Sequence, residues 1–415
     1  MYRLTLRLLA ALCLLTTFWP VLRIQDVTYF DWLAPVIVLL ALAYTPKERG
    51  APFSAYALAT FGIALLTLAG VISVAPSGDS IQHILKVWKL AVALSGIVGL
   101  AYVLENRRIL SITEALVLLC LSASANSVVC ILQGQFGILT SIMPKDLAHV
   151  EAWSRMSGLA EHPIESGIAS CFGVVIALGL GMQTRQWWIF LPLMAVGIYS
   201  LTESASLTAV FALVIAFTSV ALYAKAYKAL VLGFIVAMCG LALASALDAH
   251  RLTDRLEALS HSQGNYSTVQ SREMQWARSL DMIGPGTLLF GNGFSELDLP
   301  FRMEIHNGLI ASVFHFGLLG LAGQCLLIGF FAVRLHHKAS RTFKSILLGV
   351  LLIFAFSYLT GPALSRRSLW VTPFILGAYL TTVADRSPIR SRRIGGAPDF
   401  SGKGELAVMD DQVRD

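Results

Sequence analysis

The stretch NGLIASVFHFGLLGLAGQCLLIGFFAV, residues 307–333, runs without a single charged side chain. A helix needs about 20 predominantly apolar residues to cross the hydrocarbon core of a bilayer. The stretch is long enough for that, and the polar run that ends at His306 marks its boundary with water. The sequence therefore predicts a membrane-spanning helix here, entered from an aqueous loop.

The rest of the chain has the same character. Of its 415 residues, 56% are hydrophobic and 13% are charged, whereas soluble globular proteins carry about 25% charged residues. We expect an all-α, polytopic membrane protein in which residues 1–383 form a single membrane-embedded domain of about twelve transmembrane helices. The predicted spans are 4–22, 29–45, 53–75, 84–104, 110–132, 166–183, 187–203, 205–223, 229–247, 307–333, 344–361 and 368–383.

The short connections that carry lysine and arginine alternate onto one side of this arrangement. They read TPKERG (45–50), ENRR (105–108), QTRQ (183–186), AKAYK (224–228) and RLHHKASRTFK (334–344). Since positive residues favour the cytoplasmic side, we place both termini in the cytoplasm. Residues 384–415, rich in Gly, Ser, Pro and charge, are expected to be a disordered cytoplasmic tail.

Two longer loops, 133–165 and 248–306, then fall on the outer side. The second has helical spacing of apolar residues over 251–260 and 270–282, with glycine turns at GPG (284–286) and GNG (291–293). We therefore predict short helices in this loop.

No metal or other cofactor is expected. The six cysteines all lie in apolar runs and form no CxxC pair, which argues against a disulfide framework or a thiolate metal site. HExxH and DxD patterns are also absent from the sequence. The net charge of +6 lies mainly in short loops and the tail, so we do not expect a nucleic-acid partner.

Arginines in the outer loops run against the positive-inside trend and need another explanation. A guanidinium fork suits bidentate contacts to phosphate, and we favour such a function for Arg155 and Arg272. For Arg251, Arg255 and Arg302 the sequence leaves function and simple pairing with the acids of the same loop equally open.

His306 stands directly before Asn307, a suitable N-cap for the helix that follows. The positive end of a helix dipole favours a neutral imidazole, which can accept a proton as a general base. The alternative is a wetted boundary histidine. His315, nine residues later, does not share a helix face with His306, and we assign it to packing.

Further basic residues lie at the outer ends of spans. His83, Lys86 and Lys89 are spaced three apart and share a helix face; for Lys89 we prefer an interfacial, snorkelling role. Arg366 and Arg367 precede the last span and could attract anionic headgroups or a pyrophosphate.

Together these features resemble the O-antigen ligase and polymerase superfamily of membrane glycosyltransferases. The resemblance covers residues 150–335 and the span pattern elsewhere. It rests on Arg155, Gly158, His162 and Pro163 at one span entry, on Arg272 and Trp276, on GNGF (291–294), and on His306, Asn307, Gly317 and Gly320.

The resemblance implies a metal-independent enzyme of the GT-C type in the bacterial inner membrane, with its active site facing the periplasm. It would transfer a glycan from undecaprenyl pyrophosphate to an acceptor such as lipid A–core. His306 matches the base that acts on the acceptor hydroxyl, and Arg155 and Arg272 match arginines that hold the pyrophosphate. Substrate contacts are expected from His162, Lys86, Arg278, Arg366 and Arg367.

One departure from the family concerns the turn after the seventh span. Many members carry Ser-Arg there, whereas this chain reads TESASLT over 202–208. Either that arginine is dispensable, or Arg366 or Arg367 substitutes for it.

Other functions remain open at this point. A repeat-unit polymerase would use another carrier-linked repeat as acceptor, and a related oligosaccharyltransferase would use a protein hydroxyl. A twelve-span transporter, from a different class, should show repeated halves and helices broken at the membrane midplane. A non-catalytic membrane scaffold is a further alternative.

Overall fold

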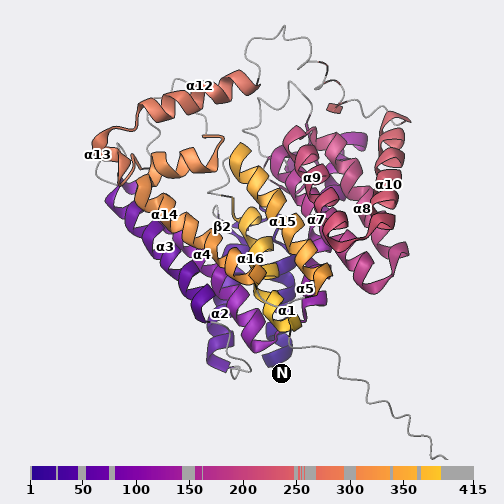
Figure 1. The fold of residues 1–415 in the computed structure, drawn as a ribbon, viewed down its shortest axis with the longest axis horizontal. Coiled ribbons are helices and arrows are strands. Elements are labelled where there is room, and N and C mark those ends of the chain that lie inside the picture. The colour runs from indigo at the N-terminus through magenta and orange to yellow at the C-terminus, as the bar shows by residue number, and fades with distance from the viewer. Residues whose placement is uncertain are drawn as a thin grey trace, which may run out of the picture.

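The computed structural model describes residues 2–24, 27–44, 53–73, 80–142, 155–160, 162–246, 251–252, 254, 257, 268–293, 305–336, 340–361 and 366–384. Each of the twelve apolar runs coincides with a helix (Figure 1). These helices are α1 (Tyr2–Leu15), α2 (Tyr29–Tyr44), α3 (Phe53–Ile72), α4 (Ser80–Arg107), α5 (Ile112–Phe136), α7 (Pro163–Thr184), α8 (Trp187–Ser204), α9 (Leu207–Ala224), α10 (Tyr227–Ala246), α14 (Gly308–His336), α15 (Arg341–Thr360) and α16 (Arg367–Ala384).

Seven helices in the described part of the chain are long and apolar enough to cross a membrane. They belong to α3, α4, α5, α7, α9, α14 and α15. This confirms the all-α class and supports a polytopic membrane protein. The count of twelve spans stays a prediction, because the remaining helices do not meet the same length and hydropathy requirements among the described residues.

The first apolar run differs from its prediction as a helix over 4–22. Helix α1 ends at Leu15, where the hydroxyl of Thr16 bonds back to the carbonyl oxygens of Leu12 and Cys13. Pro20 follows and cannot supply a backbone N–H to continue a helix. The chain then forms a two-stranded antiparallel hairpin, β1 (Arg23–Ile24) with β2 (Val27–Thr28).

Helix α7 lies at the centre of the bundle and is buried from Pro163 to Gly181, with only Glu165 partly exposed in that range. Small residues allow this, because their backbones can approach neighbouring helices closely. A Cβ atom added at Gly173 would lie 2.8 Å from the Cβ of Ala123 on α5. The hydroxyl of Ser170 bonds those of Ser127 and Ser200 at 2.9 and 2.6 Å, which joins α5, α7 and α8.

The seventh and eighth apolar runs are joined by a tight hairpin. Helix α8 ends at Ser204 and α9 begins at Leu207, with Ala205 in the left-handed region (φ 44°) between them. The Ser206 hydroxyl accepts from the N–H of Ala209 and caps α9.

Helix α14, predicted as one continuous span, is interrupted at Gly317 (φ 63°, ψ −166°). In a straight helix, residues twelve apart are separated by about 18 Å, yet the Ser312 hydroxyl donates to Gln324 Oε1 at 2.5 Å. The two parts therefore meet at a bend, and Figure 1 shows them running in different directions.

The bend of α14 is held by backbone groups of residues 289–293. The N–H groups of Asn292 and Gly293 donate to the carbonyl oxygens of Phe314 and His315 at 2.7 and 3.0 Å. The N–H of Leu319 donates to the carbonyl of Leu289 at 3.2 Å. A Cβ atom at residue 317 would lie 2.3 Å from the Leu289 backbone, so only glycine fits there.

The large loop after α10 carries short helices, as predicted for 270–282. Helices α12 (Thr268–Asp281) and α13 (Pro285–Leu288) lie at the opposite end of the molecule from the N-terminus (Figure 1). Of the 251–260 stretch only four residues are described, all in helical conformation. Arg255, Arg302 and the expected tail over 385–415 lie outside the described residues.

Candidate functional site

The first turn of α14 is held against α12 by a tryptophan. The indole N–H of Trp276 donates to the backbone carbonyl of His306 at 3.3 Å. A small apolar cluster supports this contact, in which Ile305, Ala311 and Phe314 pack against Trp276 and Met282. Helix α12 therefore fixes the position of the residue that precedes α14.

His306 lies where the sequence places it, directly before the first turn of α14. Asn307 caps this turn, since its side-chain oxygen accepts from the N–H groups of Leu309 and Ile310 at 3.0 and 3.1 Å. Burial, together with the guanidinium groups of Arg272 and Arg366, lowers the pKa of His306 to about 4. The imidazole is therefore neutral at pH 7, and its buried Nδ1 has no hydrogen-bond partner among the described residues.

Arg272 lies on α12, and its charge acts on His306. Burial lowers the pKa of its guanidinium, which remains charged at neutral pH. Its Nε is buried and makes no hydrogen bond to any residue that the structure describes. A desolvated cation is costly unless an anion or a set of acceptors compensates it, so this position favours an anionic ligand.

Arg366 directly precedes α16, and its charge also acts on His306. Its Nε lies 3.1 Å from Oε1 of Glu165, and both side chains are 11% exposed. Glu165 belongs to the first turn of α7, whose N-cap is His162. The Nδ1 atom of His162 accepts from the N–H of Ile164 at 3.1 Å, so this histidine has a capping role in the fold.

A second group of charged side chains surrounds the α8–α9 hairpin. Arg155 is buried and donates from Nε to the carbonyl of Ser204 at 2.9 Å. Glu203, fully buried, accepts from Arg251 and from Gln135. Arg251 thus pairs with an acid of the hairpin, in contrast to the alternative in which acids of its own loop bind it.

The hairpin group borders the first turns of α7. A Cβ atom at Gly167 would meet the side chains of Ser204 and Ser206 at 3.2 and 2.9 Å. Glu165, two residues earlier, holds Arg366. The first turns of α7 therefore connect the hairpin group to the group around His306. At the α8–α9 hairpin the guanidinium groups are those of Arg155 and Arg251. Arg366 instead pairs with Glu165 of α7.

Lys86 lies in a different place from His306. It is exposed on α4 and, with His83, interacts electrostatically with His315. The ring of His83 is buried and donates from Nε2 to the carbonyl of Gly70 at 2.8 Å. His315 donates from Nδ1 to the carbonyl of Gly293 at 2.7 Å, so it supports the bend of α14.

The structure places the other two predicted site residues on α12 and α16. Arg278 is exposed on α12. Arg367 begins α16, and its side chain is outside the described part of the structure.

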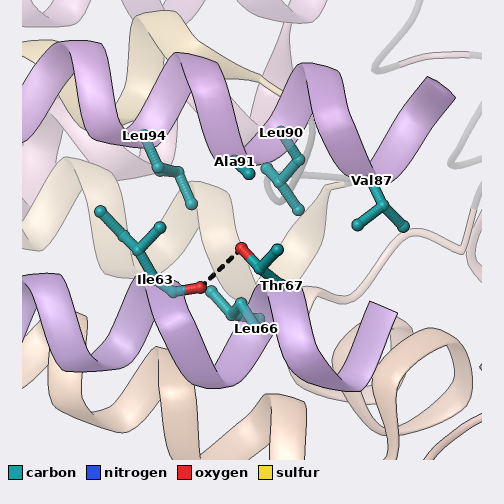
Figure 2. Close-up of a pocket in the computed structure, with 7 residues that line it drawn as sticks. All are labelled: Ile63, Leu66, Thr67, Val87, Leu90, Ala91 and Leu94. Atoms are coloured by element: carbon teal, nitrogen blue, oxygen red, sulfur yellow. Dashed lines mark hydrogen bonds between the residues drawn. The ribbon is translucent and has the colours of Figure 1, made fainter. Parts of the chain in front are cut away.

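A narrow crevice between α3 and α4 is lined by apolar side chains, with Thr67 as its one polar member (Figure 2). The hydroxyl of Thr67 donates to the carbonyl of Ile63 in its own helix at 2.8 Å. The crevice leaves no room for a water molecule. It therefore contributes packing and no chemistry.

Sequence reasoning did not single out Glu165 or Glu203. A carboxylate in the short hairpin between two apolar runs, or in the first turn of a buried helix, requires a cationic partner. Applied to the segments TESAS and EHPIES, that argument is sufficient to identify both acids as residues that need a partner.

The arrangement around His306 combines a neutral imidazole with two cations. An imidazole in this state can take a proton from a hydroxyl group, and guanidinium groups can stabilise negative charge on a leaving group. Among the residues that the structure describes, no three His, Cys, Asp or Glu side chains converge as a metal site would require. Compared with protein-family models and with curated protein sequences, the chain shows no match to either.

Proposed function

We propose that this protein is a metal-independent membrane glycosyltransferase that moves a glycan from undecaprenyl pyrophosphate to a hydroxyl group of lipid A–core. The observation that carries the proposal is His306, a neutral imidazole under the electrostatic influence of Arg272 and Arg366, whose buried Nδ1 has no hydrogen-bond partner in the described part of the chain. The resemblance of the surrounding residues to the O-antigen ligase superfamily supplies the substrate class.

In this reaction His306 takes the proton of the acceptor hydroxyl as that oxygen attacks the anomeric carbon of the donor. A glycosidic bond forms, the bond from the anomeric carbon to the pyrophosphate oxygen breaks, and the electron pair leaves with undecaprenyl pyrophosphate. Arg272 and Arg366 offset the charge that develops on the leaving group. The sugar–pyrophosphate bond is already activated, so the step needs no nucleotide.

The interrupted helix α14 is a feature that transporters also use. Here the backbone groups freed by the break bond to backbone groups of residues 289–293, and the His315 side chain donates to the carbonyl of Gly293. The main-chain groups left open by the break are therefore hydrogen-bonded by the protein's own main chain. This favours a structural role for the break over an ion-binding site.

The test is transfer by purified protein in nanodiscs supplied with the carrier-linked glycan and lipid A–core. Loss of a general base reduces rates by about 10²–10⁴-fold, and we expect His306→Ala to fall in that range. His336→Ala, at the exposed far end of the same helix, is the matched control and should keep full activity.

Arg272→Lys should also be impaired, because it keeps the charge and loses the bidentate fork. Transfer by His306→Ala at the wild-type rate would remove His306 from the mechanism. A wild-type protein that transfers no glycan to lipid A–core in this assay would overturn the proposed ligase activity.

A further inference from the structure

The proposed transfer step gives no role to Glu165, an acid that lies beside one of its arginines. Glu165 belongs to the first turn of α7 and stands three residues after the N-cap His162. Its Oε1 atom lies 3.1 Å from Nε of Arg366, and both side chains are only 11% exposed. At this distance and burial the two groups form an ion pair that solvent screens little.

The backbone that carries Glu165 is firmly anchored in the bundle. The next residue, Ser166, is fully buried, and its hydroxyl accepts from Nδ2 of Asn126 on α5 at 3.0 Å. A Cβ atom at Gly167 would lie 2.8 Å from the Cβ of Ala209 on α9. The first turns of α7 therefore pack closely against two other helices, and the carboxylate projects from a backbone with little freedom to move.

The other partner, Arg366, is tied to the start of α14 by side chains of α16 and α15. Trp370, four residues after Arg366, is fully buried, and its ring centre lies 6.2 Å from that of Tyr358. The Tyr358 hydroxyl donates to the carbonyl of Gly308 at 3.2 Å. A continuous set of contacts therefore joins the start of α16, which follows Arg366, to the start of α14, which follows His306.

An acid in this position can orient an arginine without using up its donors. A guanidinium group has five N–H donors in a rigid plane, and a carboxylate accepts through two oxygens. A carboxylate that binds the Nε edge therefore sets the plane of the fork. Donors that are already oriented stabilise a developing charge best, because they need no reorganisation during the reaction.

We propose that Glu165 is a positioning residue of the transfer reaction, which holds the guanidinium of Arg366 in the orientation that receives the departing pyrophosphate. The inference rests on the proposed glycosyl transfer and adds to it a residue that acts through Arg366. The alternative is a purely structural acid, which offsets a buried cation and favours the start of α7 as acids at helix N-termini do. The two roles differ in whether the effect of Glu165 on transfer requires Arg366.

The experiment is a double-mutant cycle on transfer by the full chain in nanodiscs, with kcat and KM for the carrier-linked glycan measured separately. The cycle uses Glu165→Gln, Arg366→Gln and the two combined. Glu165→Asp keeps the charge on a shorter side chain and serves if Glu165→Gln does not fold, which thermal unfolding in detergent reports. Asp281→Asn, an exposed acid on α12, is the control for loss of one negative charge.

We expect Glu165→Gln to lower kcat by about 10- to 100-fold, because a small misplacement of a group near the reacting atoms can cost that much. KM should change little, since the affected contact strengthens in the transition state. In the Arg366→Gln background, Glu165→Gln should have no further effect on kcat. Asp281→Asn should keep the wild-type kcat.

A full effect of Glu165→Gln on kcat in the Arg366→Gln background would make Glu165 a structural acid and overturn the proposal. Wild-type kcat in every folded Glu165 variant would overturn it too, as would an equal loss in Asp281→Asn. These outcomes leave the transfer reaction itself in place. A wild-type protein without transfer activity would instead overturn the proposed function, and the role of Glu165 with it.

Discussion

His306 is a histidine whose neighbours determine its protonation state. Burial and two adjacent guanidinium groups all disfavour a positive charge on the ring, and its pKa falls to about 4. An unperturbed histidine titrates near pH 6.5 and would be partly protonated in mildly acidic surroundings. Here the ring stays unprotonated across the whole neutral range.

The first prediction concerns this titration. In protein labelled at histidine carbons, the NMR midpoint of His306, assigned with His306→Asn, should lie near 4. Arg366→Gln should raise the midpoint, since it removes one cation, while burial and Arg272 keep it below the unperturbed value of about 6.5. Because the unfolded chain binds the proton more tightly, this group's contribution to stability is present above about pH 6.5 and is lost as the pH falls towards 4. A wild-type midpoint at 6.5 or higher would contradict the described environment.

Glu203 gives a second prediction at the residue scale. It is fully buried and paired with Arg251, which is 21% exposed. Removing one partner of a buried pair leaves a charge uncompensated and destabilises by about 3 kcal/mol. Glu203→Gln should therefore lower the unfolding temperature in detergent, and Glu203→Gln combined with Arg251→Gln should lower it less. Arg251→Gln alone completes the cycle, and a double-variant loss equal to the sum of the two single losses would show that the pair has no coupling.

Contacts between residues close in sequence can be predicted from the sequence, whereas contacts in the site between distant residues cannot. The Asn307 cap was predicted from its place before an apolar run, and the structure confirms it. The approach of Arg366 to His306 joins residues sixty positions apart and leaves no local pattern. The sequence identifies Arg366 only as one of several outer arginines, because tertiary packing of α16 against α7 decides which of them reaches the histidine.

At the scale of elements, the apolar runs predict helix positions to within a few residues for most of the chain. Their ends are set locally, by caps such as Ser111 and Ser340 and by charged connections. The break in α14 is different, because a glycine inside an apolar run is equally compatible with a continuous helix. It forms here because residues 289–293 dock against it.

The third prediction tests that break with two glycines of the same helix. Gly317→Ala forces a side chain into the left-handed region and against the Leu289 backbone, at a cost on the order of 2–4 kcal/mol. Gly329→Ala meets no atom within 4 Å, and alanine favours a helix by about 1 kcal/mol over glycine. Thermal unfolding should show the first variant destabilised and the second unchanged or stabilised. Equal unfolding temperatures would mean that α14 does not need the bend.

At the scale of the whole molecule, two charged regions lie at opposite ends of the helices. The end with α12 carries Arg272, Arg366 and His306, and the end with the N-terminus carries a cavity with three arginines and two glutamates in its lining. The placement of the short basic connections predicts that the second end faces the cytoplasm. The helices fix the two ends relative to each other, so a single measurement of sidedness assigns both.

The fourth prediction concerns which end of the molecule faces the cytoplasm. Arg278→Cys on α12 should react with a membrane-impermeant maleimide in intact spheroplasts, and Arg185→Cys, after α7, should react only once the membrane is permeabilised. The unsubstituted protein, with Cys239 and Cys325 exposed on its surface, gives the background labelling. Reaction in the reverse order would place the His306 region in the cytoplasm and would rule out a periplasmic transfer site.

The backbone hydrogen bonds between residues 289–293 and the bend of α14 have a consequence for how this sequence can change during evolution. Most of these contacts join main-chain atoms, so replacement of the surrounding apolar side chains leaves them intact. Selection at this place acts on the spacing of Gly291, Gly293 and Gly317, whose positive φ angles other residues adopt poorly. Distant relatives of this chain should therefore share that glycine spacing after ordinary sequence similarity has been lost.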